Sequence, residues 1–260
     1  MADKAEQGVT VRSVERSLDI LEILAAAPDS LSLTELSARS ALPAPTILRL
    51  LRTLQGRGYV RQAGPRRYVL GSRARRLASA GTRAAGRTAE EFLRELVALS
   101  GETAKLTVLD GDDVLCVASV PSPHPVRMFT EAGARMMPHC TSAGKAMLAQ
   151  LPPSEARELL TRTGLPAVTT ATITDLEKML ALLGEVRSQG YALDDGERAD
   201  DVCCVAVPVA STAGPAALSV SGPSSRMPVT TRRKLVTGMR DIAERFAAAL
   251  DPAETVRQSG

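Results

Sequence analysis

Aromatic residues are scarce in this sequence, and tryptophan is absent. Three Tyr and three Phe make up only 2% of the 260 positions. Proteins that bind single-stranded nucleic acid stack the bases on exposed aromatic rings. The composition therefore argues against a single-strand binder.

Long apolar runs are also missing. No stretch approaches the roughly 18 consecutive apolar residues that a transmembrane helix needs. The first residues, MADKAEQG, are polar and lack the apolar segment of a secretion signal. We therefore expect a cytoplasmic protein that does not enter a membrane.

Cysteine and histidine are few. Cys116, Cys140, Cys203 and Cys204 form no C-x-x-C pair, so we expect reduced thiols rather than disulfides. If the fold brought His139 together with the last three of these, they could ligate a metal. A metal-responsive or thiol-responsive protein is therefore the alternative hypothesis. The spacing fits no standard zinc motif, and we expect no metal and no other cofactor.

Motifs typical of enzymes are absent as well. No G-x-S-x-G occurs. The segment SAGK at 142–145 is not a phosphate loop, because His139 stands where the first Gly should be and Ala146 replaces the Ser or Thr. His139 and Cys140 are sequence neighbours, which rarely face each other as base and nucleophile. We expect no catalytic residues.

The charge is distributed unevenly. Residues 11–87 contain 14 Arg, no Lys and five acidic residues, a net charge of +9, whereas the whole chain carries +3. The first ten residues carry −1, so residues 88–260 carry −5. A basic N-terminal part joined to an acidic remainder indicates a polyanion-binding module followed by a module of another kind.

The basic part has the pattern of a winged helix-turn-helix. We expect a helix over 11–27, with Val14, Leu18, Leu21 and Ala25 facing the core, then helices over 34–40 and 44–57. Strands at 59–62 and 67–70, separated by Gly64-Pro65, predict a hairpin. Three helices and a hairpin within about 60 residues are typical of this fold.

The third predicted helix is suited to the major groove. Its apolar residues Ile47, Leu50, Leu51 and Leu54 share one side, so its Thr and Arg residues would face outward. Arginine pairs with guanine edges, and arginines at a hairpin tip contact phosphates. The predicted DNA-binding residues are Thr34, Pro45, Thr46, Arg49, Arg52, Thr53, Arg66 and Arg67.

The rest of the chain predicts a linker helix and an α+β domain. We expect a disordered tail at 1–10, the DNA-binding domain at 11–75, the linker helix at 76–98, a second domain at 99–250 and a tail at 251–260. In the second domain, strands at 106–109 and 114–117 flank the turn DGDD, and a third strand is predicted at Val126–Phe129. Further predicted helices lie at 142–150, 154–160, 175–188 and 230–250, and further strands at 202–209 and 216–221. Strand hairpins with segregated helices indicate an antiparallel sheet.

Seven short segments stand out in order along the chain: VERSLDIL at 14–21, LTEL at 33–36, LPAPTILRLL at 42–51, AGKAMLA at 143–149, GYA at 190–192, VAVPV at 205–209 and SVSGP at 219–223. Together they resemble the IclR-type family of bacterial transcriptional regulators. The resemblance covers roughly residues 11–250. One departure is Ala44-Pro45, where the family often has a polar pair, so a DNA contact from that turn is in doubt.

The resemblance implies a winged-helix domain, a linker helix that helps dimerisation, and a GAF-like effector domain. It also implies a homodimer or dimer of dimers. As partners we expect double-stranded operator DNA and a small organic-acid or aromatic-acid effector. We expect the apolar linker between Leu77 and Leu96 to form the seam. Carried over by motif, the effector-binding residues are Ser142, Ala143, Asp194, Val202, Cys204, Ser219 and Ser221.

Residue chemistry is compatible with that pocket. Ser219 and Ser221 are two apart on a strand, so both hydroxyls point to one face. A helix start at Ser142 offers free N–H groups to a carboxylate, without a balancing cation. Met128, Met136 and Met137 would supply an adaptable apolar wall. Two simpler interpretations stay open: Asp194 caps a turn, and Cys204 is a small core residue.

Overall fold

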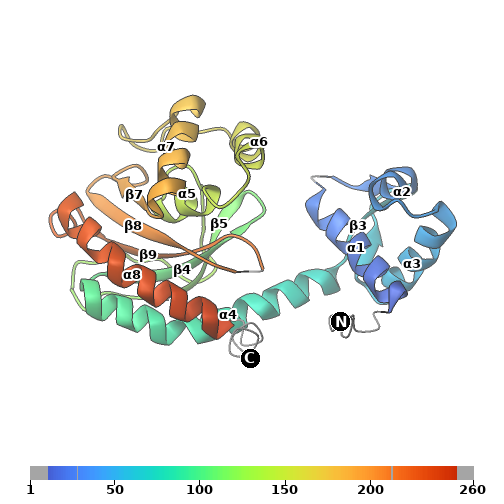
Figure 1. Cartoon of the computed structure of the whole chain (residues 1–260), viewed down its shortest axis with the longest axis horizontal. Helices are drawn as coiled ribbons and strands as arrows, with labels where there is room; N and C mark the ends of the chain where they lie inside the picture. The colour runs from blue at the N-terminus through green and yellow to red at the C-terminus, as the bar shows by residue number, and fades with distance from the viewer. Residues whose placement is uncertain (1–10, 28, 212, 251–260) are drawn as a thin grey trace, which may run out of the picture. The chain divides into compact units, whose positions relative to one another are not determined.

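The computed structural model describes residues 11–27, 29–211 and 213–250, without the side chains of 75 and 78–83. The tails predicted at 1–10 and 251–260 lie outside these residues. The chain divides into two compact units, Met1–Thr82 and Arg83–Gly260, and the division falls inside one long helix (Figure 1).

The N-terminal unit is a three-helix winged helix-turn-helix. Its elements are α1 (Arg12–Ala26), β1 (Leu31–Ser32), α2 (Leu33–Ser40), α3 (Ala44–Gly56), β2 (Val60–Gln62) and β3 (Arg67–Leu70). The Ser32 hydroxyl accepts from the N–H of Glu35 while the Glu35 carboxylate accepts from the N–H of Ser32, a capping box that fixes the start of α2. The strands form a small antiparallel sheet in the order β1-β3-β2, in which β1 was not predicted.

The prediction for the buried face of α1 was wrong. Ile20 and Leu24 are the buried residues of this helix, whereas Val14 and Leu18 are 54% and 52% exposed. Apolar residues cover a wide arc of α1, so their spacing alone fits two adjacent faces. The exposed face is therefore an apolar surface that the described residues of the N-terminal unit leave uncovered.

Helix α4 (Ser72–Ser100) belongs to both units. Its second half is part of the C-terminal core, where Ala89, Leu93 and Leu96 are fully buried with strand and α8 residues. Leu96 is thus sealed inside its own domain and cannot form the predicted seam between subunits. Leu77, at the other end of the predicted seam, is 60% exposed.

The C-terminal unit is an antiparallel sheet covered by helices on both faces. Its elements are β4 (Thr103–Asp110), β5 (Asp113–Val120), β6 (Arg135–Met136), α5 (Ser142–Leu148), α6 (Pro153–Thr163), α7 (Leu176–Gln189), β7 (Ala192–Asp195), β8 (Val202–Val209), β9 (Ala216–Pro223) and α8 (Val229–Leu250). The six strands lie in the order β6-β5-β4-β9-β8-β7. One core packs α4 and α8 on one face, and a second packs α5, α6 and α7 on the other (Figure 1).

The strand predicted at Val126–Phe129 does not form. Three prolines at 121, 123 and 125 precede this segment, and proline lacks the N–H that strand pairing requires. The loop is held instead by side chains: the Thr103 hydroxyl donates to the carbonyl of Met128 at 2.8 Å, and Arg226 donates to the carbonyl of Val126 at 2.8 Å. The short strands β6 and β7 were not predicted.

None of the helices within the described residues combines the length and apolarity needed to cross a bilayer.

Candidate functional site

Helix α3 presents a polar, basic surface held by a buried apolar side. Ile47, Leu50, Leu51 and Leu54 are buried, as predicted. On the other side Pro45, Arg49, Arg52 and Thr53 are exposed and Thr46 is half-buried. The Thr53 hydroxyl donates to the carbonyl of Arg49 at 3.2 Å. The arginines are thus free to meet a polyanion, while the hydroxyl of Thr53 is already bonded to its own helix.

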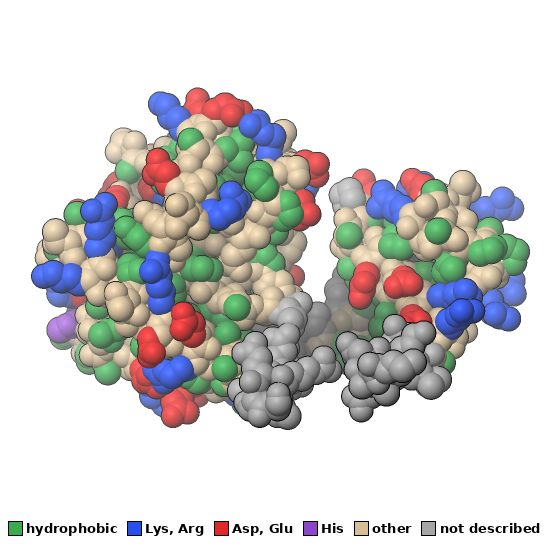
Figure 2. All heavy atoms as spheres, in the orientation of Figure 1, with side chains coloured by type: hydrophobic (Ala, Val, Ile, Leu, Met, Phe, Trp, Pro, Cys, Tyr) green, Lys and Arg blue, Asp and Glu red, His purple; other side chains and the backbone are tan. Residues whose placement is uncertain are grey.

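The wing places its two arginines in different environments. Arg66 is exposed and has a left-handed backbone, with φ of 58°, at the hairpin tip. The Arg67 guanidinium donates to the Ser30 hydroxyl at 2.9 Å and lies 3.5 Å from the Glu35 carboxylate. Arg67 therefore ties the wing to the start of α2, where Thr34 is also exposed. Figure 2 shows Arg side chains of the N-terminal unit gathered along one margin.

A cavity in the C-terminal unit brings together the predicted effector residues. All seven, namely Ser142, Ala143, Asp194, Val202, Cys204, Ser219 and Ser221, line it. It holds about 510 Å³ of space free of atoms, with the open solvent at its mouth included. Met128 and Met136 contribute apolar wall, as expected, whereas Met137 is not among the lining residues.

Strand register explains why these side chains converge. Ser221 is paired with Cys204 on β8, and Cys204 is paired with Asp194 on β7. Directly paired residues in an antiparallel sheet point to the same face, here the face covered by α5. The Ser219 and Ser221 hydroxyls are buried and have no hydrogen-bond partner in the described chain. Buried polar atoms normally have partners, so these two are suited to a ligand.

Two cations of the pocket were missed. Lys105 on β4 is 7% exposed and lines the cavity, and Arg198 is an exposed residue of its lining. The expectation of a carboxylate site without a balancing cation was therefore wrong. Lys105 lies one residue before the predicted strand, and sequence spacing did not reveal that β4 pairs with β9, which places Lys105 opposite Ser219.

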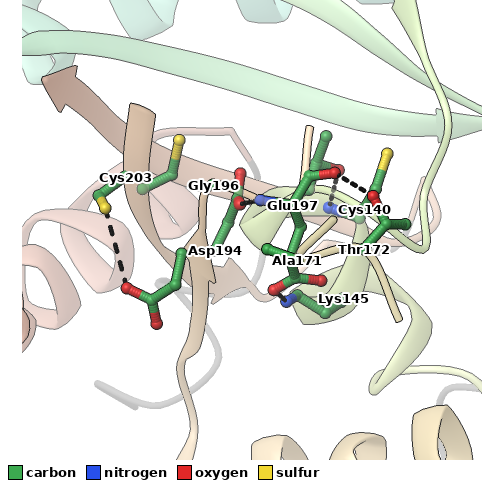
Figure 3. Close-up of polar contacts among 12 residues, drawn as sticks. Cys140, Lys145, Ala171, Thr172, Asp194, Gly196, Glu197 and Cys203 are labelled. Atoms are coloured by element: carbon green, nitrogen blue, oxygen red, sulfur yellow. Dashed lines mark hydrogen bonds and ion pairs between the residues drawn. The ribbon is translucent and has the colours of Figure 1, made fainter. Parts of the chain in front are cut away.

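A buried ion pair supports the turn that carries Asp194. Lys145 of α5 donates to the carboxylate of Glu197, and both side chains are almost fully buried (Figure 3). The N–H of Glu197 donates to Asp194 at 2.8 Å, and the Thr172 hydroxyl donates to the carbonyl of Glu197 at 2.6 Å. Asp194 thus does cap a turn and lines the cavity as well.

Burial raises the pKa of Asp194, against the opposing effects of the Glu197 N–H and Lys145. It also raises the pKa of Glu197, although Lys145 lowers it. Burial raises the pKa of Cys204 to about 12, so this thiol is neutral at physiological pH. The charged residues of the cavity lining are thus two cations, Lys105 and Arg198, and one carboxyl group, that of Asp194.

The metal or thiol alternative does not fit this fold. Cys203 packs with the α4–α8 core, whereas Cys204 lines the cavity on the opposite face, so His139, Cys140, Cys203 and Cys204 cannot converge. Within 11–250, less residues 28 and 212, no group of His, Cys, Asp and Glu is arranged to hold a metal ion. Burial raises the pKa of all four thiols, which disfavours the reactive thiolate.

A winged helix-turn-helix followed by a curled antiparallel-sheet domain defines a class, the DNA-binding transcriptional regulators. The model of the bacterial transcriptional regulator IclR C-terminal domain matches residues 83–248, and that of the IclR helix-turn-helix domain matches residues 13–64. The chain belongs to the IclR family.

Individual proteins agree with this assignment. The HTH-type transcriptional regulator BhcR of Paracoccus denitrificans (strain Pd 1222) is 36% identical over 228 residues, which cover 86% of this chain and 81% of BhcR. The crystal structure of an IclR transcriptional regulator from Silicibacter sp. TM1040 matches with a TM-score of 0.62 and 28% identity, covering 92% of this chain and 96% of that one. An IclR homologue of Microbacterium hydrocarbonoxydans, crystallised with 4-hydroxybenzoate, matches with a TM-score of 0.59 and 24% identity, covering 93% and 100%.

Proposed function

We propose that this regulator binds operator DNA in the cytoplasm through α3 and the wing, and that a small organic acid in the C-terminal cavity controls that binding. The observation that carries the effector half is the pair of buried hydroxyls, Ser219 and Ser221, which have no partner among the described residues and line the cavity. The protein holds this acid without converting it, since the lining offers no paired nucleophile and base among the described residues.

The DNA half rests on the exposed arginines. Arg49 and Arg52 lie on the outer side of α3 for base contacts, and Arg66 at the wing tip is placed for phosphate. Arg67 lies next to Arg66 in the wing and is therefore kept in the proposed DNA interface. Its contacts with Ser30 and Glu35 hold the wing against the start of α2. Thr34, Pro45, Thr46 and Thr53 complete the surface.

The test begins by recovering genomic fragments that the purified protein retains and sequencing them. Fluorescence anisotropy then compares a recovered operator with a scrambled duplex. Arg49→Ala should weaken the operator more than the scrambled DNA, whereas Arg66→Ala should weaken both and reduce the salt slope of log K by about one unit. Arg233→Ala, at an exposed position on α8, is the control and should change neither the affinities nor the salt slope.

The effector half is tested in the same assay with a panel of acids. The panel contains 4-hydroxybenzoate, aliphatic hydroxy acids and keto acids, each with its neutral amide. An effector should change operator affinity by about 5- to 150-fold, and calorimetry should show that it binds Ser219→Ala and Asp194→Ala more weakly.

Two outcomes would contradict these proposals. If Arg49→Ala weakened binding to operator and to random DNA equally, Arg49 would have no base-reading role. If the protein converted an acid of the panel, the non-enzymatic proposal would be overturned.

A further inference from the structure

Lys105 is a buried cation for which the described chain supplies no counter-ion. Its side chain lines the effector cavity, the residue is 7% exposed, and none of the hydrogen bonds or ion pairs found among the described residues includes it. The buried polar atoms without a partner among the described residues belong to Glu197, Ser219 and Ser221, so the Lys105 ammonium itself keeps access to solvent through the cavity. Its position therefore calls for a partner that enters the cavity.

The other charges near the cavity do not serve as that partner. Glu197 is paired with Lys145, and Arg198 is itself a cation. Asp194 lies on β7, separated from β4 by β9 and β8. Three strand spacings amount to about 14 Å between the two backbones. The charge of Lys105 is thus left for a ligand, and the carboxylate of Asp194 stands at the far side.

Uncharged groups fill the floor between the two charges. Lys105 is paired with Ser219 across the β4–β9 ladder, so the two side chains share a face. Ser221 follows on the same strand face, and Cys204 lies between Ser221 and Asp194. From β4 to β7 the cavity floor therefore runs from a cation, through two unpartnered hydroxyls, to a carboxylate.

We propose that Lys105 binds the anionic group of the effector, with the hydroxyls of Ser219 and Ser221 donating to the same group, and that Asp194 accepts a hydrogen bond from a hydroxyl at the effector's other end. This inference rests on the proposed function and adds the orientation and chemical class of the ligand. The class is a monoanionic acid with a hydroxyl remote from its acidic group.

This arrangement selects against three related classes. A neutral amide leaves Lys105 without a counter-ion. A simple carboxylic acid leaves Asp194 without a donor, and unsatisfied buried groups reduce affinity. A dicarboxylate places a second negative charge beside Asp194, where like charges repel. The ranking of ligands by affinity therefore follows from Lys105 at one end of the cavity floor and Asp194 at the other.

The experiment is calorimetry on the full-length protein and its variants. The probes are 4-hydroxybenzoate, 4-hydroxybenzamide, benzoate and terephthalate, together with a series of aliphatic ω-hydroxy acids and their amides. Lys105→Met should weaken the hydroxy acids by about 10- to 100-fold, as expected for a hydrogen bond to a charged group. Lys105→Arg should retain part of the affinity. Lys178→Met, which removes an exposed lysine on α7, is the matched control and should bind as the unmodified protein does.

The acid-to-amide affinity ratio of the unmodified protein is a second readout that does not depend on how a variant folds. The inference predicts a ratio above about 10, which Lys105→Met reduces to near one. If an acid binds Lys105→Met as tightly as the unmodified protein while Ser219→Ala weakens it, Lys105 is not the anchor and the effector pocket stands. If amides bind as tightly as acids, the inference is overturned as well. If no acid of the panel binds the unmodified protein, the effector half of the proposed function fails and this inference with it.

Discussion

At the scale of single residues, the C-terminal unit buries several charged side chains around its cavity. Lys105, Lys145, Asp194 and Glu197 are all buried and all lie at or next to the cavity. Buried charges are seldom the most stabilising choice for a core, and apolar replacements often stabilise it. Their concentration here fits a cavity built to recognise a charged ligand at some cost in stability.

The pH dependence of stability should reveal the burial of Asp194. Its pKa is raised in the folded state, so between the unfolded and folded pKa values the folded protein binds more protons, and stability falls as pH rises through that interval. Asp194→Asn removes this titration but keeps an oxygen to accept from the Glu197 N–H. We therefore expect the melting temperature of Asp194→Asn relative to the unmodified protein to be higher at pH 8 than at pH 4.

Differential scanning calorimetry across this pH range measures the effect. The control is Asp200→Asn, which replaces an exposed carboxylate a few residues away. Its melting temperature should differ from that of the unmodified protein by the same amount at both pH values. A melting difference for Asp194→Asn that did not grow with pH would show that the carboxylate is solvated or neutralised in the folded state.

At the scale of elements, α5 is set by a close approach of two backbone segments. A Cβ placed on Gly144 would lie 2.2 Å from the carbonyl oxygen of Pro138, far inside contact distance. The hydroxyl of Thr141 caps the helix by accepting from the Gly144 N–H at 3.1 Å. The glycine therefore allows the helix start, with Ser142 and Ala143, to pack against the preceding loop at the cavity wall.

Gly144→Ala should lower the free energy of unfolding by about 1–3 kcal/mol or more, because the backbone must shift to admit the methyl group. Gly184→Ala is the matched control, since that glycine is exposed in the middle of α7 with no atom near its Cβ position. It should raise the free energy of unfolding by about 0.5–1 kcal/mol through helix propensity. Chemical denaturation of both variants measures the change in the free energy of unfolding. If the two changes were equal, Gly144 would have no special role in close packing.

How much the sequence predicted depends on the range of the interactions. The hairpin of β4 and β5 and the buried side of α3 are determined by local spacing, and both were predicted. The prediction of a strand at Val126–Phe129 was wrong, because the apolar residues suggested a strand while the preceding prolines prevent strand pairing. The seven proposed effector residues, which line one cavity, were identified through motifs. Lys105 was missed because its place in the cavity depends on β4 pairing with β9, over a hundred residues away in the chain.

At the scale of the whole molecule, an exposed apolar stripe lies on α1. Val11, Val14 and Leu18 are 61%, 54% and 52% exposed and recur at helical spacing along one side. One winged helix makes few base contacts, and two-fold pairing lets such proteins bind two half-sites. We therefore expect this stripe to contact a second copy of the chain in a homodimer or dimer of dimers.

Leu18→Glu tests this expectation, because a carboxylate on the stripe would have to be desolvated in the interface. Multi-angle light scattering of the unmodified protein should give a multiple of the 27.4 kDa chain mass, and the variant should shift toward the single-chain mass at micromolar concentration. Its operator affinity should fall together with the mass, since the second half-site contact is lost. Val126→Glu introduces the same charge at a residue that is 71% exposed in the C-terminal unit, and it should leave both mass and affinity unchanged. A single-chain mass for the unmodified protein would refute the dimer, whereas an unchanged mass for Leu18→Glu would place the contact between subunits on a surface other than α1.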